Sequence, residues 1–122
     1  MWNVYPHRSG FVENNEKSWD VVSPILGKID RIKALIRIKT NLLVGRSQNI
    51  IYPMHQDNDH HESGATTSIL YLTTCNGGTV FCDGSIVDSV ANRLVTFPSG
   101  IKHAGMAPTD APYKIAINLN YF

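Results

Sequence analysis

The stretch MHQDNDHHESG, residues 54–64, gathers histidine and carboxylate side chains that could together bind a metal ion. Imidazole and carboxylate groups are common protein ligands of first-row transition metals. Side chains at positions i and i+2 of an extended segment point the same way, so His55 and Asp57 can converge while Gln56 points away. The other candidates lie further into a loop rich in Asp, Ser and Gly, where we expect them to be solvated: Asp59, His60, His61 and Glu62.

Two ligands make a poor metal site, so a third has to come from elsewhere in the chain. His103, in FPSGIKHAG, also follows an expected strand and a turn, which makes it the obvious candidate. Two histidines and one carboxylate on one face of a metal leave coordination positions open, the arrangement that non-haem Fe(II) oxygenases use. The competing interpretation is a polar loop that binds no metal, and an isolated H-x-D pair does not distinguish the two.

Length, composition and net charge indicate how many domains the chain forms and which partners it is expected to have. A chain of 122 residues, 43% hydrophobic and 17% charged, is expected to form one globular domain. Its net charge of +1 gives no electrostatic reason to expect nucleic acid or an anionic membrane as a partner. No apolar run approaches the ~20 residues that cross a bilayer, and the N-terminus lacks a signal-peptide core. We therefore expect a cytoplasmic protein.

The elements that must position these residues are mostly strands. A short helix is expected near residues 23–31 with Pro24 in its first turn, after an irregular stretch over the first twenty residues. From residue 34 onward, short β-branched segments alternate with turns of Gly, Pro and Asn, which predicts an all-β sandwich or barrel. The expected strands are 34–44, 66–74, 78–82, 85–90, 92–97 and 113–122.

Four motifs occur together in a recognisable order: HQD, SILYLTTCNGGTVFCDG, NRLVTFPSGIKHAG and YKIAINLNYF. In this order they resemble the prolyl 4-hydroxylase-like branch of the iron(II)/2-oxoglutarate-dependent dioxygenases, over residues 35–122. The short chain and RIKTNL look similar to small phage-encoded members, which would work in the host cytoplasm. The resemblance implies a double-stranded β-helix, a cupin-like jelly-roll, with at most one or two short N-terminal helices. Residues 1–33 would form an irregular or short helical segment of the single domain 1–122, and residues 34–122 its core.

The resemblance also implies a ligand set. His55, Asp57 and His103 would bind Fe(II). Lys114 stands where the family carries the basic residue that pairs with the far carboxylate of 2-oxoglutarate, although most relatives have arginine there. Tyr71 matches a tyrosine that donates a second hydrogen bond to that carboxylate in some relatives.

The alternation of the last segment supports an inward position for Lys114. A period of two residues places Lys114 on one face with Ala116, Asn118 and Asn120, and we include Asn118 in the expected cosubstrate pocket. A lysine on an inward face is costly without an anionic partner. The alternative is that Lys114 lies at an exposed edge.

The function implied by the resemblance is that of an Fe(II)- and 2-oxoglutarate-dependent dioxygenase. It would use O2, with ascorbate as an optional reductant, to hydroxylate an unactivated C–H bond and release succinate and CO2. A peptidyl proline is the expected substrate, with other peptides, proteins or small molecules as alternatives, and no catalytic residue is expected beyond the metal ligands. Two other functions stay open: a cupin-like metal-binding or isomerase domain without 2-oxoglutarate, and a truncated, inactive member. A dimer could cover a face left exposed by the short N-terminus.

Overall fold

The computed structural model describes residues 16–57 and 64–122, which fall into two compact units, Met1–Lys33 and Ala34–Phe122. The first unit contains helix α1 (Glu16–Leu26). The expected bounds 23–31 were wrong, and so was the irregular assignment of residues 16–20. Pro24 lies in the last turn of the helix and not the first. A proline at this position removes one intrahelical hydrogen bond and crowds the preceding turn, and the helix ends two residues later.

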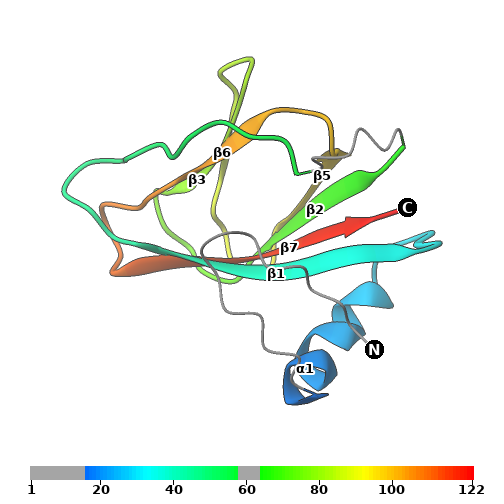
Figure 1. The fold of residues 1–122 in the computed structure, drawn as a ribbon. Coiled ribbons are helices and arrows are strands. Elements are labelled where there is room, and N and C mark those ends of the chain that lie inside the picture. Colours follow the sequence, from blue (N-terminus) through cyan, green and yellow to red (C-terminus); the bar gives the residue numbers. More distant parts are fainter. Residues whose placement is uncertain (1–15, 58–63) are drawn as a thin grey trace. The chain divides into compact units, whose positions relative to one another are not determined.

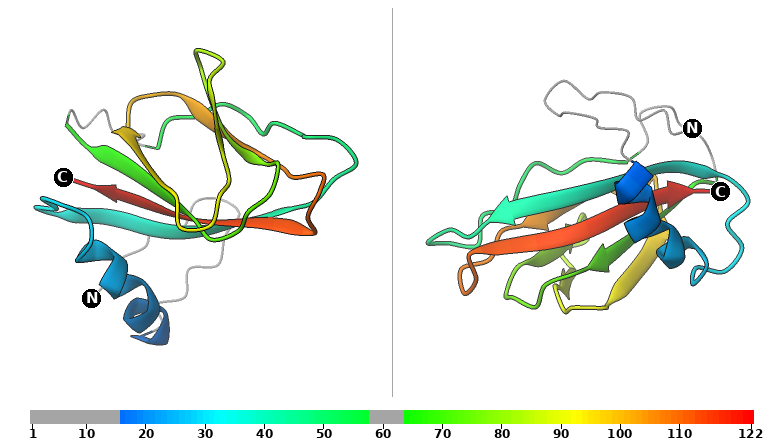
Figure 2. Two further views of the ribbon diagram at one scale, coloured as in Figure 1. Left: turned by 180° about the vertical axis from the view of Figure 1, so that it is seen from behind. Right: turned by 90° about the horizontal axis from the view of Figure 1, so that it is seen from below.

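The second unit consists of antiparallel strands in two sheets (Figure 1). One sheet has the order β1-β7-β2-β5 and the other β4-β3-β6, and Figure 2 shows β1 at the outer edge of the first. This arrangement confirms the expected all-β fold with a short helix. The strands are β1 (Leu35–Val44), β2 (Thr66–Tyr71), β3 (Gly78–Phe81), β4 (Ile86–Asp88), β5 (Leu94–Pro98), β6 (His103–Met106) and β7 (Tyr113–Tyr121).

Strand β6 was not expected from the sequence, and it does most to position the candidate site. It pairs with β3 on one side. On the other side it forms isolated bridges with the chain that follows β1, at Ile51 opposite Met106 and at His55 opposite His103. The segment from residue 51 to residue 55 therefore runs antiparallel to β6, next to the second sheet.

The register of the first sheet defines which side chains point between the two sheets. Residues directly opposite each other in an antiparallel pair share a face. Tyr71 pairs with Ala116, and both belong to the buried apolar cluster with Ile69 and Phe97. Lys114, Asn118 and Asn120 lie on the same face of β7 as Ala116, as the sequence predicted, and each is at most 6% exposed.

No helix among the described residues is long and apolar enough to cross a membrane.

Candidate metal centre

Backbone pairing brings the two expected histidine ligands together. The N–H of His55 donates to the carbonyl of His103 (2.9 Å), and the N–H of His103 donates back to the carbonyl of His55 (3.0 Å). Such a doubly bonded pair places the two Cα atoms about 5.5 Å apart with both side chains on one face. Asp57 follows two residues after His55, so its side chain returns to that face.

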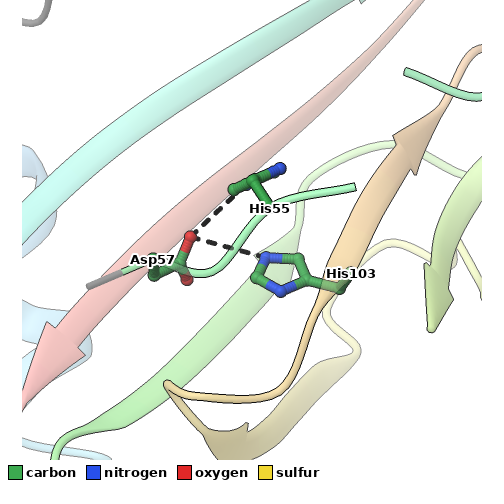
Figure 3. A group of neighbouring side chains, drawn as sticks. All are labelled: His55, Asp57 and His103. Atoms are coloured by element: carbon green, nitrogen blue, oxygen red, sulfur yellow. Dashed lines mark ion pairs between the residues drawn. The ribbon is translucent and has the colours of Figure 1, made fainter. Parts of the chain in front are cut away.

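Three side-chain atoms converge at this point, and Figure 3 shows the three groups pointing toward one another. Asp57 Oδ1 lies 3.5 Å from His55 Nε2 and 3.4 Å from His103 Nε2. The ligand atoms of His55, Asp57 and His103 all lie within 4.8 Å of one another. Ligand atoms about 2.1 Å from one divalent ion lie roughly 3–4 Å apart, as Asp57 Oδ1 does from the two Nε2 atoms, so the cluster is a candidate metal centre.

Backbone carbonyls set the protonation of both imidazole rings. His55 Nδ1 lies 3.2 Å from the carbonyl of Pro53, and His103 Nδ1 lies 3.0 Å from that of Ile101. A carbonyl can only accept, so each Nδ1 carries a proton and donates. In the neutral ring the lone pair is then on Nε2, the atom that faces Asp57, as a metal ligand requires.

The two oxygens of the Asp57 carboxylate have different surroundings. Oδ2 accepts hydrogen bonds from Thr67 Oγ1 (2.8 Å), Asn120 Nδ2 (3.2 Å) and Asn118 Nδ2 (3.4 Å). Oδ1 is buried and accepts none from the described residues. The side chain as a whole is 1% exposed. A buried carboxylate oxygen without a donor, facing two imidazole lone pairs, is satisfied by a cation.

The electrostatics of the cluster favour positive charge at the same point. Burial acts to raise the pKa of Asp57, but the favourable interaction of its carboxylate with the His103 and His55 rings, when these are protonated, outweighs burial and holds that pKa well below its usual range. The Asp57 carboxylate, which would accept from a protonated Nε2, raises the pKa of His55 against the opposing effects of partial burial and of Lys39. Protons and divalent cations compete for such a position, so the donor set fits a metal ion.

Several polar residues around Asp57 were not recognised from the sequence as part of the site. Thr67 and Asn120 both donate to its carboxylate, and Ser99 Oγ lies 2.9 Å from Thr67 Oγ1. Arg37 donates through Nε to Asn120 Oδ1 (3.2 Å) and lies 4.0 Å from Asp57 Oδ1. Threonine, serine, asparagine and arginine occur throughout the chain, so their types alone do not mark a site. Only Asn120 could have been recognised from the sequence, because it alternates onto the same inward face as Lys114.

The residues expected to hold a cosubstrate lie in two places along the interior. Lys114 is 4% exposed, and its Nζ donates to the carbonyl of Gly78 at 2.5 Å. That Nζ is 6.0 Å from the ring centroid of Tyr71, whose hydroxyl lies 2.6 Å from Thr79 Oγ1. Burial lowers the pKa of Lys114 to about 8. Asn118 lies away from this pair, with its amide nitrogen toward Asp57.

The remaining acidic and histidine side chains of the opening stretch fall on residues 58–63, outside the described part of the chain. Their expected solvation therefore stays a prediction.

Comparison with known proteins gives no match to a family model and no match to a curated protein. The solved structures that are similar in fold include a monooxygenase and a cupin protein. A non-heme monooxygenase, ThoJ, in a nickel complex, matches with a TM-score of 0.59 and 12% identity over 84% of this chain. A cupin protein from Bacteroides fragilis matches with a TM-score of 0.57 and 12% identity over 98% of this chain and 82% of its own.

The chain has the cupin jelly-roll fold. This confirms the architecture that the resemblance implied. The chain spans 49% of the length of the monooxygenase structure. At 12% identity the likeness concerns the path of the backbone, and the chemistry has to be argued from the residues of this cupin-fold chain.

Proposed function

We propose that this protein is an Fe(II)- and 2-oxoglutarate-dependent dioxygenase of the prolyl 4-hydroxylase-like type. The observation that carries the proposal is the combination of two features in one jelly-roll. One is the cluster of His55, Asp57 and His103, whose ligand atoms converge. The other is the buried Lys114, which needs an anionic partner.

The first feature supplies the metal ligands. His55 Nε2, His103 Nε2 and Asp57 Oδ1 would hold Fe(II), because all three atoms face one point and the carboxylate oxygen lacks another donor. Three protein ligands leave positions for other molecules. Bound Fe(II) supplies the redox chemistry by which enzymes of this class couple decarboxylation of 2-oxoglutarate to hydroxylation, with succinate and CO2 as products. That a protein of similar fold is a non-heme monooxygenase supports this choice.

The second feature separates this proposal from a plain cupin. Within the described residues, the Nζ of Lys114 has one polar contact, the neutral carbonyl of Gly78, and forms none of the ion pairs. Desolvating an ammonium group without an opposite charge is unfavourable, and a carboxylate is the partner that would compensate it. A domain that binds only a metal has no need for such a lysine.

The spacing along β7 suits a short dicarboxylate. Asn118, which contacts Asp57, and Lys114 are four residues apart on one face of the strand, which corresponds to about 13 Å between their Cα atoms. A five-carbon dicarboxylate together with the lysine side chain can bridge that span. One carboxylate would lie near the metal and the other would accept from Lys114, with Tyr71 beside it. Asn118 would then border the metal end of the cosubstrate.

The substrate is proposed from the resemblance: a prolyl residue in a peptide or protein. His55 leaves one side of the cluster open, since its side chain is 54% exposed, whereas His103 is 3% exposed. A substrate would approach from the His55 side.

The second candidate function, a cupin-like metal-binding or isomerase domain, is favoured by the fold likeness to a cupin protein.

The test is anaerobic titration of 2-oxoglutarate into protein loaded with Fe(II), followed by visible absorption. We expect a weak charge-transfer band in the native protein, no band in His103→Ala, and a band that needs at least tenfold more 2-oxoglutarate in Lys114→Met. Lys28→Met, which replaces an exposed lysine outside residues 34–122, is the matched control and should resemble the native protein. Admitting O2 with a proline-containing peptide should then yield succinate.

The outcomes separate the candidate functions. Metal binding without a band that depends on 2-oxoglutarate would reject the dioxygenase and leave the cupin-like function. Absence of metal binding would reject both and indicate an inactive member.

A further inference from the structure

We propose that Thr67 and Asn120 are positioning residues that make Asp57 a metal ligand through one oxygen only. The inference rests on the proposed function in one respect, that a metal ion binds at His55, Asp57 and His103. It concerns how the chain prepares the carboxylate for that ion.

The argument begins with the hydroxyl of Thr67. Its oxygen lies 2.8 Å from Asp57 Oδ2, 2.9 Å from Ser99 Oγ and 2.9 Å from Asn120 Nδ2. An ionised carboxylate only accepts and an amide nitrogen only donates. Thr67 must therefore give its single proton to Asp57, and Ser99 must donate to Thr67. The direction of every hydrogen bond around this threonine is thus fixed.

The amide of Asn120 is fixed in the same way. Its Nδ2 donates to Asp57 Oδ2 and to Thr67 Oγ1, while its Oδ1 accepts from Nε of Arg37. Rotating the amide by 180° would set Oδ1 against the carboxylate and the NH2 group against the guanidinium. Arg37 therefore acts through Asn120, by holding the orientation in which Asn120 is a donor.

These contacts occupy one carboxylate oxygen and leave the other for a cation. Oδ2 receives its donors from β2 and β7, two neighbouring strands of one sheet, so its place is set by the sheet. Oδ1 points at the two imidazole Nε2 atoms. A carboxylate bound through one oxygen takes one coordination position, whereas a chelating carboxylate takes two. Thr67 and Asn120 would therefore raise metal affinity and keep one more position free.

Cobalt(II) is the probe for this inference, because its visible absorption reports both binding and coordination. Thr67→Val removes the hydroxyl at nearly constant shape, and we expect it to weaken Co(II) binding by roughly 10–100-fold and to change the absorption spectrum. Thr67→Ser keeps the hydroxyl and should restore native affinity and spectrum. Ser68→Ala is the matched control, because it removes an equally buried hydroxyl on the next residue of β2, one that bonds to Thr96 and Tyr121 instead.

Asn120→Ala is a second test of the inference in case Thr67→Val folds poorly. It should also weaken Co(II) binding by roughly 10–100-fold. If Thr67→Val and Asn120→Ala both bind Co(II) with native affinity and spectrum, the inference is overturned while the metal centre stands. If Ser68→Ala weakens binding as much as Thr67→Val, the effect is general destabilisation and the inference is also overturned. If the native protein binds no Co(II), the proposed metal centre itself fails.

Discussion

Lys114 carries its amino group into the interior, where its polar contact is a backbone carbonyl. A carbonyl stabilises an ammonium less than a carboxylate does, so burial lowers the lysine's pKa to about 8 from 10.5. A difference of this size corresponds to a cost of roughly 3 kcal/mol at neutral pH when no anion is bound. This cost in stability is what we expect of a lysine kept for the anion site proposed above.

The first prediction concerns how this lysine makes stability depend on pH. The folded state releases the Lys114 proton near pH 8, whereas the unfolded chain retains it to about pH 10.5. Between these values the unfolded state binds more protons, so the free energy of unfolding should rise with pH. Urea denaturation at pH 7 and pH 9.5 measures the change. The highest pH of the experiment is kept below 10 because burial raises the pKa of Tyr71. Above that pH, the ionisation of Tyr71 in the unfolded chain would lower the free energy of unfolding and mask the rise due to Lys114.

Lys114→Met is the comparison for this prediction. The variant should be more stable than the native protein at pH 7 and should lose the rise between pH 7 and pH 9.5. A native protein whose stability does not increase over this interval relative to Lys114→Met would contradict the buried, charged lysine.

At the residue scale, site residues of uncommon or costly types could be recognised from the sequence, whereas site residues with common hydroxyl and amide side chains could not. His55, Asp57, His103 and Lys114 stood out because histidine, and a lysine with inward alternation, need a reason to be where they are. Thr67 and Asn120 did not stand out, because hydroxyl and amide side chains are frequent. Their role depends on a register between β2 and β7 that no local pattern encodes.

At the scale of elements, the strands with alternation or β-branched residues were predicted, including the short strands β3 and β4, whereas β6 was not. The last strand, Tyr113–Tyr121, was expected as 113–122 because its nine residues alternate clearly. Strand β6 is four residues long, HAGM, and contains an alanine and a glycine, so it offers neither alternation nor β-branched residues. It exists because β3 and the segment from Ile51 to His55 pair with it on either side.

The second prediction concerns the close approach of β3 and β4 at Gly78. A Cβ atom on Gly78 would lie 2.2 Å from the carbonyl oxygen of Val87, a backbone atom that cannot move without shifting β4. We expect Gly78→Ala to lower the free energy of unfolding by about 1–3 kcal/mol, as overpacking in a tight site does. Urea denaturation measures the loss.

Gly100→Ala is the control for Gly78→Ala. Nothing lies within 4 Å of a Cβ built on Gly100, so this substitution should change stability by less than about 0.5 kcal/mol. Equal effects of the two substitutions would show that general glycine flexibility, and not the close approach to Val87, accounts for the loss.

At the scale of the whole jelly-roll, the candidate metal centre connects both sheets. His103 begins β6 in the three-stranded sheet, and His55 is paired to it through the backbone. Asp57 is held by Thr67 of β2 and Asn120 of β7, in the four-stranded sheet. A metal ion bound by these three ligands would therefore join elements that otherwise meet mainly through the packing of their inner faces.

The last prediction is that metal binding stabilises residues 34–122 as a unit. A ligand that binds only the folded state adds RT ln(1 + [L]/Kd), which is about 2.7 kcal/mol at one hundred times Kd and would raise Tm by roughly 10–20 °C. Thermal unfolding followed by circular dichroism, with increasing Co(II), should show this shift, and a chelator should reverse it.

Asp57→Asn should abolish the shift, because a neutral amide is a poor ligand for a divalent ion. Asp83→Asn changes an exposed carboxylate that bonds to Ser85, and it should leave the shift intact. A Tm that rises equally in Asp57→Asn would place the bound metal elsewhere on the chain.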